Sequence, residues 1–195
     1  AVAAGLCDVA VVGGGMAGVM TPGTTVKAPP IEFVDEYGGY VVPLFAMIAQ
    51  RHMAQFGTTA EQIASVSAAI RNQGNSNPEA IMFGKGTYTV EDILASPMVA
   101  SPLHRLDTCL VGEGGAAFVV TTVERARDLR HSPVLVLGGG MEFAGAPYAN
   151  APTYREVGQL GRTAADRAFE LAGIGVHDVD VFCLYDPSSF EIIRQ

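Results

Sequence analysis

Short apolar runs that alternate with helical patterns constrain the fold of this sequence more than any other feature. Four runs, rich in valine, cover residues 6–12, 116–121, 133–137 and 179–184. Continuous apolar runs of this length are typical of strands that are buried on both faces of a parallel sheet. Helical patterns separate the runs, including a long alanine-rich one over residues 154–172. The alternation predicts an α/β fold with a mainly parallel sheet and helices on both faces.

Helix boundaries are clearly marked between the first and second runs. Pro43 suits the first turn of a helix. Thr58 or Thr59 begins a second helix, with capping-box partners among the residues that follow, and Thr89 caps a short third helix in the same way. Together these signals predict a mostly helical excursion over about residues 20–103, between two sheet strands. A segment in that position is typically a lid or a pocket wall.

Composition and charge exclude several classes of protein. Hydrophobic residues make up 49% of the 195 residues and charged residues only 16%, so the chain can bury a large core. A net charge of −8 disfavours nucleic acid or an anionic membrane surface as a partner. Because no apolar run reaches about eighteen residues, no membrane-spanning helix is predicted.

Cysteine and histidine spacing gives no sign of a disulfide framework or a metal site. Cys7, Cys109 and Cys183 are an odd, widely spaced set, each within an apolar run. We expect them to be buried, reduced thiols of a cytoplasmic protein. The histidines stand alone and no pair has the spacing of metal ligands, so no metal is expected.

The glycine-rich segment Gly13-Gly-Gly-Met-Ala-Gly18 fits the pattern G-x-G-x-x-G, and Glu32 follows at nearly the spacing of a dinucleotide site. That site also needs a helix that opens at the third glycine, and Pro22 and Pro29 interrupt the chain too early for one. We therefore interpret the segment as a glycine turn where two backbones pass closely.

The candidate site lies at the end of the last apolar run. Tyr185 and Asp186 follow the strand predicted over residues 179–184, and Ser188 or Ser189 can cap a helix that begins there. In open α/β sheets, ligands bind at the carboxyl ends of strands. Tyr185 could carry a proton or donate a hydrogen bond there. The alternative is that Tyr185 merely closes a strand and Asp186 makes a turn.

Both termini suggest that the sequence is part of a longer protein. Ala1 begins within what looks like the end of a helix, with Gly5 as the residue that ends it, and no signal peptide precedes it. Gln195 lies within a helix that has only just begun. We expect residues on both sides of this segment.

Three stretches together resemble a known family. Residues 6–14 are similar to the strand that follows the nucleophile helix in thiolases. Residues 103–117, continuing to Asp128, resemble the sterol-carrier-protein branch of the thiolase superfamily. Residues 184–191, Leu-Tyr-Asp-Pro-Ser-Ser-Phe-Glu, look like the lipid-transfer-protein thiolase homologues, some of which cleave steroid side chains.

The resemblance implies a layered thiolase-like fold of two similar halves. Residues 1–130 would be the end of the N-terminal half, including a loop-domain insertion over 20–103 that helps to hold an acyl-CoA, and residues 131–195 the start of the C-terminal half. The nucleophilic cysteine of the family would lie before Ala1, and its later histidine and second cysteine after Gln195. None of the three cysteines of this sequence falls on either cysteine position.

The resemblance also implies roles for the candidate site. Tyr185 stands where thiolases have asparagine and the sterol-carrier branch has histidine, and Asp186 stands at the acidic position. Ser188 replaces a phenylalanine of the family, which affects the packing of the corner. A tyrosine at this position favours an acid–base role, because it can take a proton from a hydroxyl group.

Three functions are then compatible with the residues. The first is retro-aldol cleavage of a C–C bond in a bulky lipid or steroid acyl-CoA, with Tyr185 as acid–base. The second is ordinary acetyl-CoA acyltransferase activity through a cysteine outside this sequence, and the third is a non-catalytic lipid or acyl-CoA carrier. The resemblance implies a coenzyme A thioester as substrate, no covalently bound cofactor, a homodimer or larger oligomer, and a small OB-fold, zinc-containing partner protein. The segment alone is expected to be inactive, because half of the family's site is absent from it.

Overall fold

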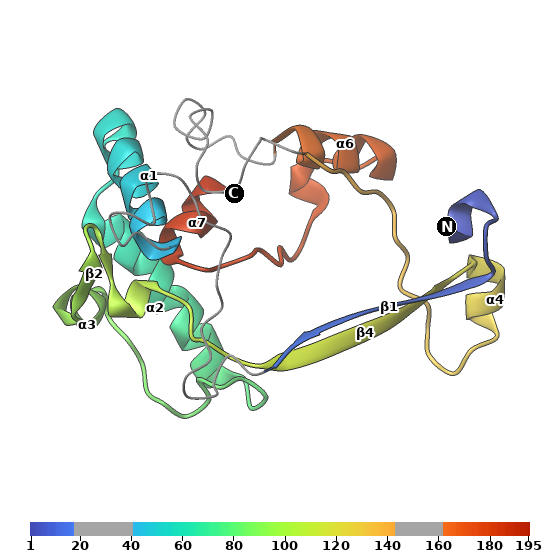
Figure 1. Ribbon diagram of the computed structural model, residues 1–195, viewed down its shortest axis with the longest axis horizontal. Coiled ribbons are helices and arrows are strands. Elements are labelled where there is room, and N and C mark those ends of the chain that lie inside the picture. Colours follow the sequence, from blue (N-terminus) through green and yellow to red (C-terminus); the bar gives the residue numbers. More distant parts are fainter. Residues whose placement is uncertain (18–40, 143–161) are drawn as a thin grey trace.

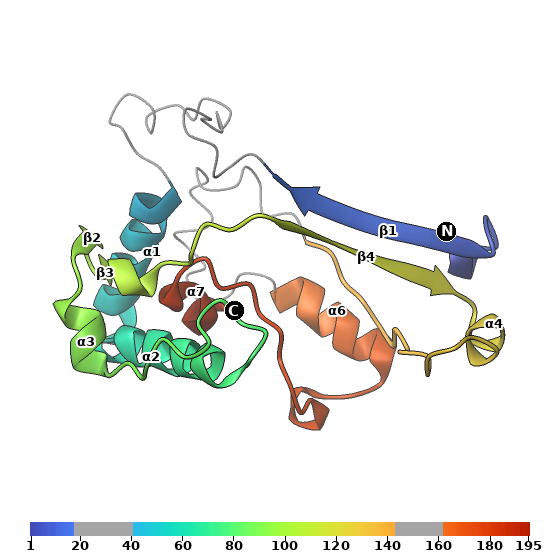
Figure 2. The same ribbon diagram turned by 90° about the horizontal axis from the view of Figure 1, so that it is seen from below.

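The computed structural model describes residues 1–17, 41–142 and 162–195. The helices over residues 41–95 and 189–194 gather at one end of the molecule as a helical cluster, and a long two-stranded ribbon runs from this cluster to the other end (Figures 1 and 2). The short helix over residues 123–127 lies at that other end. The helical cluster holds α1 (Val41–Phe56), α2 (Ala60–Ser76), α3 (Val90–Ala95), β2 (Met98–Ala100), β3 (Leu103–His104), the 3-10 turn η2 (Arg105–Asp107) and α7 (Ser189–Arg194). The remaining elements are η1 (Val2–Ala4), β1 (Val9–Met16), β4 (Gly114–Thr121), α4 (Val123–Arg127), α6 (Arg162–Ala172) and η3 (Val176–Asp178).

The hydrophobic core lies in the helical cluster, on two sides of α2. Ile63 of α2 joins one group of buried side chains contributed by α1, β3 and α7. Ala64 and Ala68 of the same helix pack with Ile93 of α3 in a second group. Phe190 of α7 is fully buried in the first group, so the C-terminal helix is part of this core. The helical excursion and the end of the chain therefore form one packed unit.

The predicted helix boundaries in this unit are confirmed. Thr59 is the N-cap of α2, and its hydroxyl accepts from the backbone N–H of Gln62 at 3.3 Å while its own N–H donates to the Gln62 side chain at 2.9 Å. Thr89 makes the same reciprocal pair with Asp92 at the start of α3. These local patterns were sufficient because each cap involves residues only three positions apart.

The ribbon corrects the prediction of a parallel sheet. β1 and β4 pair antiparallel, from Val9 opposite Thr121 to Met16 opposite Gly114. The hairpin β2–β3 is also antiparallel, so the mainly parallel sheet is not present among the described residues. Gly13, Gly14 and Gly15 lie in β1 rather than in a turn, and Gly18 lies outside the described residues. A Cβ on Gly13 would lie 3.3 Å from the Cβ of Ala117, so the close passage of two backbones was correctly inferred.

The predicted strands over residues 133–137 and 179–184 are absent: both segments are irregular in the structure, with a bend at Asp180. Their apolar side chains are open, with Val134 94% and Val181 81% exposed. An apolar run forms a strand only beside a neighbouring strand, and the described residues supply none here. Burial of all three thiols was wrong for the same reason: Cys109 and Cys183 are exposed, and Cys7 is partly exposed.

The helix predicted over 154–172 is described from Arg162 onward and ends at Gly173, which has the expected left-handed φ of 69°. Glu32, the two prolines that follow the first strand, and the start of this helix lie outside the described residues. Among those described, no helix is long and apolar enough to cross a membrane.

Candidate functional site

Tyr185 and Asp186 lie at a corner where the chain passes from an exposed segment into the core. The Tyr185 side chain is 71% exposed, and Asp186 is also exposed. Residues 187–191 are buried, with Ser188 only 1% exposed. Ser188 takes the N-cap position of α7, as predicted, although its hydroxyl makes no capping bond. The tyrosine ring is thus accessible, and the backbone beside it is anchored.

Ser188, where the family has a phenylalanine, is buried, and its hydroxyl has no hydrogen-bond partner. Phe190, two residues later, fills the adjoining core and meets the ring of His52 edge-on, with centroids 5.4 Å apart. Ser188 itself forms an antiparallel bridge with Thr108. A small residue suits this position because the neighbouring chain passes directly beside it.

The turn over residues 104–109 holds the corner from the other side. The Ser189 hydroxyl donates to Oδ1 of Asp107 at 2.8 Å in a buried contact. The backbone N–H of Cys109 donates to the carbonyl of Pro187 at 3.1 Å. Together with the bridge at Thr108, these contacts join residues 107–109 to residues 187–189.

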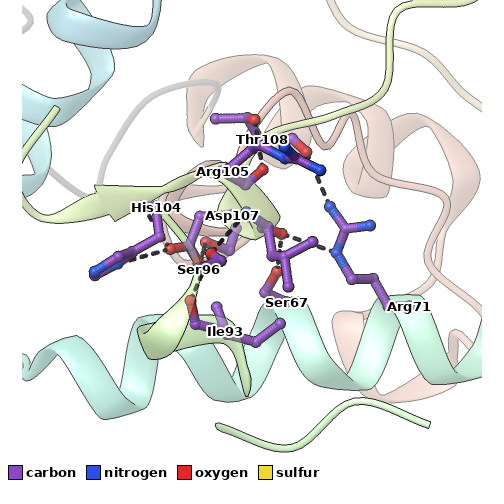
Figure 3. Close-up of polar contacts among 10 residues, drawn as sticks. Ser67, Arg71, Ile93, Ser96, His104, Arg105, Asp107 and Thr108 are labelled. Atoms are coloured by element: carbon purple, nitrogen blue, oxygen red, sulfur yellow. Dashed lines mark hydrogen bonds and ion pairs between the residues drawn. The ribbon is translucent and has the colours of Figure 1, made fainter. Parts of the chain in front are cut away.

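Helix α2 holds that turn in place, as Figure 3 shows. Arg71 donates from Nε to the carbonyl of Leu106 at 2.9 Å and from Nη2 to the carbonyl of Thr108 at 3.2 Å. The Ser67 hydroxyl donates to the same Leu106 carbonyl. Oδ2 of Asp107 accepts the N–H of His104 at 2.9 Å. A planar guanidinium that bonds two backbone carbonyls sets both position and orientation.

A cleft of about 330 Å³ opens beside the corner. Asp186 and Ser189 line it from the corner, and Arg71 lines it from α2. Its remaining walls are mostly apolar and come from α2 and the segments over residues 82 and 106–110. A partly apolar cleft with a few converging polar groups is the usual form of a small-molecule site.

Two buried titratable groups lie close to this region. Burial lowers the pKa of His52, whose Nδ1 lies 3.0 Å from the Thr58 hydroxyl. Burial also raises the pKa of Glu191, and the ion pair with Arg194 opposes that rise. Both members of the ion pair belong to α7, so this charge is neutralised within the helix that carries the corner. In the part of the chain that the structure describes, no three His, Cys, Asp or Glu side chains gather as a metal site.

Sequence reasoning selected Tyr185 and Asp186 but missed Asp107, Arg71 and Ser189 as a supporting group. The spacing of His104 and Asp107 is that of a reciprocal cap and could have marked the turn. Nothing in the sequence indicates that Arg71 reaches that turn, because the two segments meet only in the folded chain.

Comparisons with known proteins agree with this fold. No protein-family model matches the chain. It is 35% identical over 148 residues to the 17-hydroxy-3-oxo-4-pregnene-20-carboxyl-CoA lyase of Mycobacterium tuberculosis, covering 72% of this chain and 37% of that protein. It is 31% identical to the acetyl-CoA acetyltransferase of Methanothermobacter thermautotrophicus, covering 95% of this chain and 49% of that protein.

The solved structure of an Ltp2-ChsH2(DUF35) aldolase is similar with a TM-score of 0.80 and 26% identity, over 98% of this chain and 51% of that one. The mixed α/β, thiolase-like fold is therefore confirmed, and the chain belongs to the thiolase superfamily. Within it, the chain falls in the branch of the sterol-carrier-protein and lipid-transfer-protein thiolases. It spans about half, or less, of the length of these relatives.

Proposed function

We propose that this chain is part of an enzyme that cleaves a C–C bond in a bulky, steroid-like acyl-CoA by a retro-aldol reaction, with Tyr185 as the acid–base group and Asp186 as the acidic group of the same site. The observation that carries the proposal is the position of Tyr185. Its ring is 71% exposed at a fixed corner, and the adjacent Asp186 lines the cleft. A lyase of a steroid acyl-CoA among the relatives supports the substrate class.

The proposed reaction needs one group that moves a proton at the β-hydroxyl of the substrate. Tyr185 accepts the hydroxyl proton, the oxygen forms a carbonyl, and the bond between the α and β carbons breaks. The electron pair passes to the α carbon and is stabilised as the enolate of the thioester, which is then protonated. This sequence of steps requires no cysteine nucleophile.

The test is Tyr185→Phe in the full-length natural protein, assayed for release of the cleaved ketone from a β-hydroxyacyl-CoA. We expect turnover to fall by about 10²–10⁴-fold, the usual contribution of a positioned acid–base group. Tyr88→Phe is the matched control, because it removes the same hydroxyl while keeping the ring that packs against Arg71. Undiminished turnover in Tyr185→Phe would refute the proposal.

An ordinary acyltransferase is the second candidate. It is favoured by the acetyl-CoA acetyltransferase relative, which matches 95% of this chain. That reaction passes through a covalent acyl-cysteine, so mass spectrometry of the protein quenched with acyl-CoA separates the two. An acyl adduct on a cysteine supports thiolysis, and ketone release without an adduct supports retro-aldol cleavage. Binding of the thioester without any product would instead indicate a carrier.

The assembly and the domain division are proposed on the same grounds. A division into residues 1–130, with a loop domain over 20–103, and residues 131–195 follows from the thiolase pattern. The similar aldolase carries two protein names, Ltp2 and ChsH2, which supports a partner protein for this chain as well. Size-exclusion chromatography with light scattering would separate a homodimer from a complex of two different chains.

A further inference from the structure

We propose that Asp107 is a positioning residue for the Tyr185 corner and acts through Ser189. The inference rests on the proposed function, because it concerns the same proton-transfer step. The side-chain hydrogen bonds of Asp107 go to Ser189 and to the backbone of His104. Asp107 therefore acts on the corner indirectly, through the start of α7.

The two carboxylate oxygens of Asp107 bind two different segments. Oδ1 accepts the hydroxyl of Ser189 at 2.8 Å, and Oδ2 accepts the backbone N–H of His104 at 2.9 Å. The ring Nδ1 of His104 lies 3.6 Å from the same Oδ2. With both oxygens engaged and the residue only 4% exposed, the side chain has one favourable orientation.

The hydroxyl of Ser189 fixes the first residue of α7. Tyr185 precedes it by four residues, and Pro187 between them is tied by its carbonyl to Cys109. A shift at the beginning of α7 is therefore passed directly to the corner. The bond joins segments 82 residues apart, so it couples the corner to the turn rather than stabilising either segment locally.

The turn can act as a fixed reference because α2 holds it. Arg71 bonds the carbonyls that flank Asp107, at Leu106 and Thr108. Ser67 bonds the Leu106 carbonyl as well. Helix α2 thus fixes the turn, Asp107 of the turn fixes Ser189, and Ser189 at the start of α7 fixes the corner. A misplacement of about 1 Å at a reacting group can lower the rate by about 100-fold.

The experiment compares Ser189→Ala, Asp107→Asn and the double variant in the full-length natural protein. We expect kcat of Ser189→Ala to fall at least tenfold, a larger change than that in KM for the acyl-CoA. The double variant should lose less than the product of the two single losses, because both changes act on the contact between Ser189 and Asp107. Asp92→Ala is the matched control: like Asp107, Asp92 accepts a backbone N–H from the residue three positions earlier, here Thr89, but it makes no bond to Ser189.

The outcomes separate this inference from the proposed function. If Ser189→Ala keeps kcat within twofold of wild type while Tyr185→Phe is inactive, the positioning role is wrong and the proposed function stands. If Asp92→Ala loses kcat as much as Ser189→Ala, the effect is a general loss of structure and the inference fails. A Tyr185→Phe enzyme that turns over normally overturns the proposed function, and this inference with it.

Discussion

Replacing Phe190 by alanine tests whether α7 is docked as the structure shows. The side chain is fully buried, contacts the core cluster of α1, α2 and β3, and meets His52 edge-on. Removing a buried phenyl ring costs its transfer free energy and leaves a cavity, together about 3–5 kcal/mol. Since α7 directly follows the corner, we also expect Phe190→Ala to lower turnover by the proposed enzyme.

The stability change can be measured as the midpoint of thermal unfolding of the full-length protein. At about 2–4 °C per kcal/mol for a domain of this size, the loss corresponds to a decrease of roughly 6–20 °C. Phe83→Ala is the control, because it deletes the same ring from a side chain that is 52% exposed. It should cost about 1 kcal/mol or less. An equal, small effect of both substitutions would show that Phe190 is not in a packed core and that the corner is not anchored there.

Two further perturbations follow from the same contacts. Burial lowers the pKa of His52, so the folded protein binds a proton on this side chain less readily than the unfolded chain does, where the pKa is about 6.5. The free energy of unfolding should therefore decrease as the pH falls below about 6.5. Urea unfolding of His52→Gln between pH 7.5 and 5 should show a shallower loss than wild type, and identical slopes would contradict the assignment. A Cβ at Gly140 would collide with the backbone carbonyl of Ala164 in α6, whereas one at Gly139 would meet nothing within 4 Å. Gly140→Ala should therefore lower the unfolding midpoint by several degrees and Gly139→Ala should not; equal midpoints would mean that this segment does not pack on α6.

The sequence predicted those features that depend on neighbouring residues. Caps at Thr59 and Thr89 and the left-handed glycine at Gly173 each involve positions within one helical turn. The corner after residue 184 was predicted for the same reason: an apolar run ends there, and Pro187 and the two serines follow within five residues. Rules that involve residues only a few positions apart can be applied to the sequence directly.

The remaining features depend on partners that the sequence does not specify. The apolar run of β1 favours a strand, but its antiparallel partner β4 lies about a hundred positions away, and nothing in the run indicates direction. Residues 133–137 and 179–184 carry equally strong strand patterns and remain unpaired among the described residues. An apolar run therefore indicates that a segment favours burial, but whether it forms a strand depends on the element that packs beside it.

A proton-transferring tyrosine must be open to its substrate and yet held in one place. The chain can meet both requirements because solvent exposure changes at Pro187. The residues before it, Tyr185 and Asp186, are exposed, and those after it are buried against the turn and the core. Ser189 and Phe190 thus hold the corner in position, and the proposed chemistry falls to the exposed side chains before Pro187. Substitutions after Pro187 should consequently change stability and turnover together, whereas substitutions before it should change turnover alone, and this difference is what an acid–base role for Tyr185 requires.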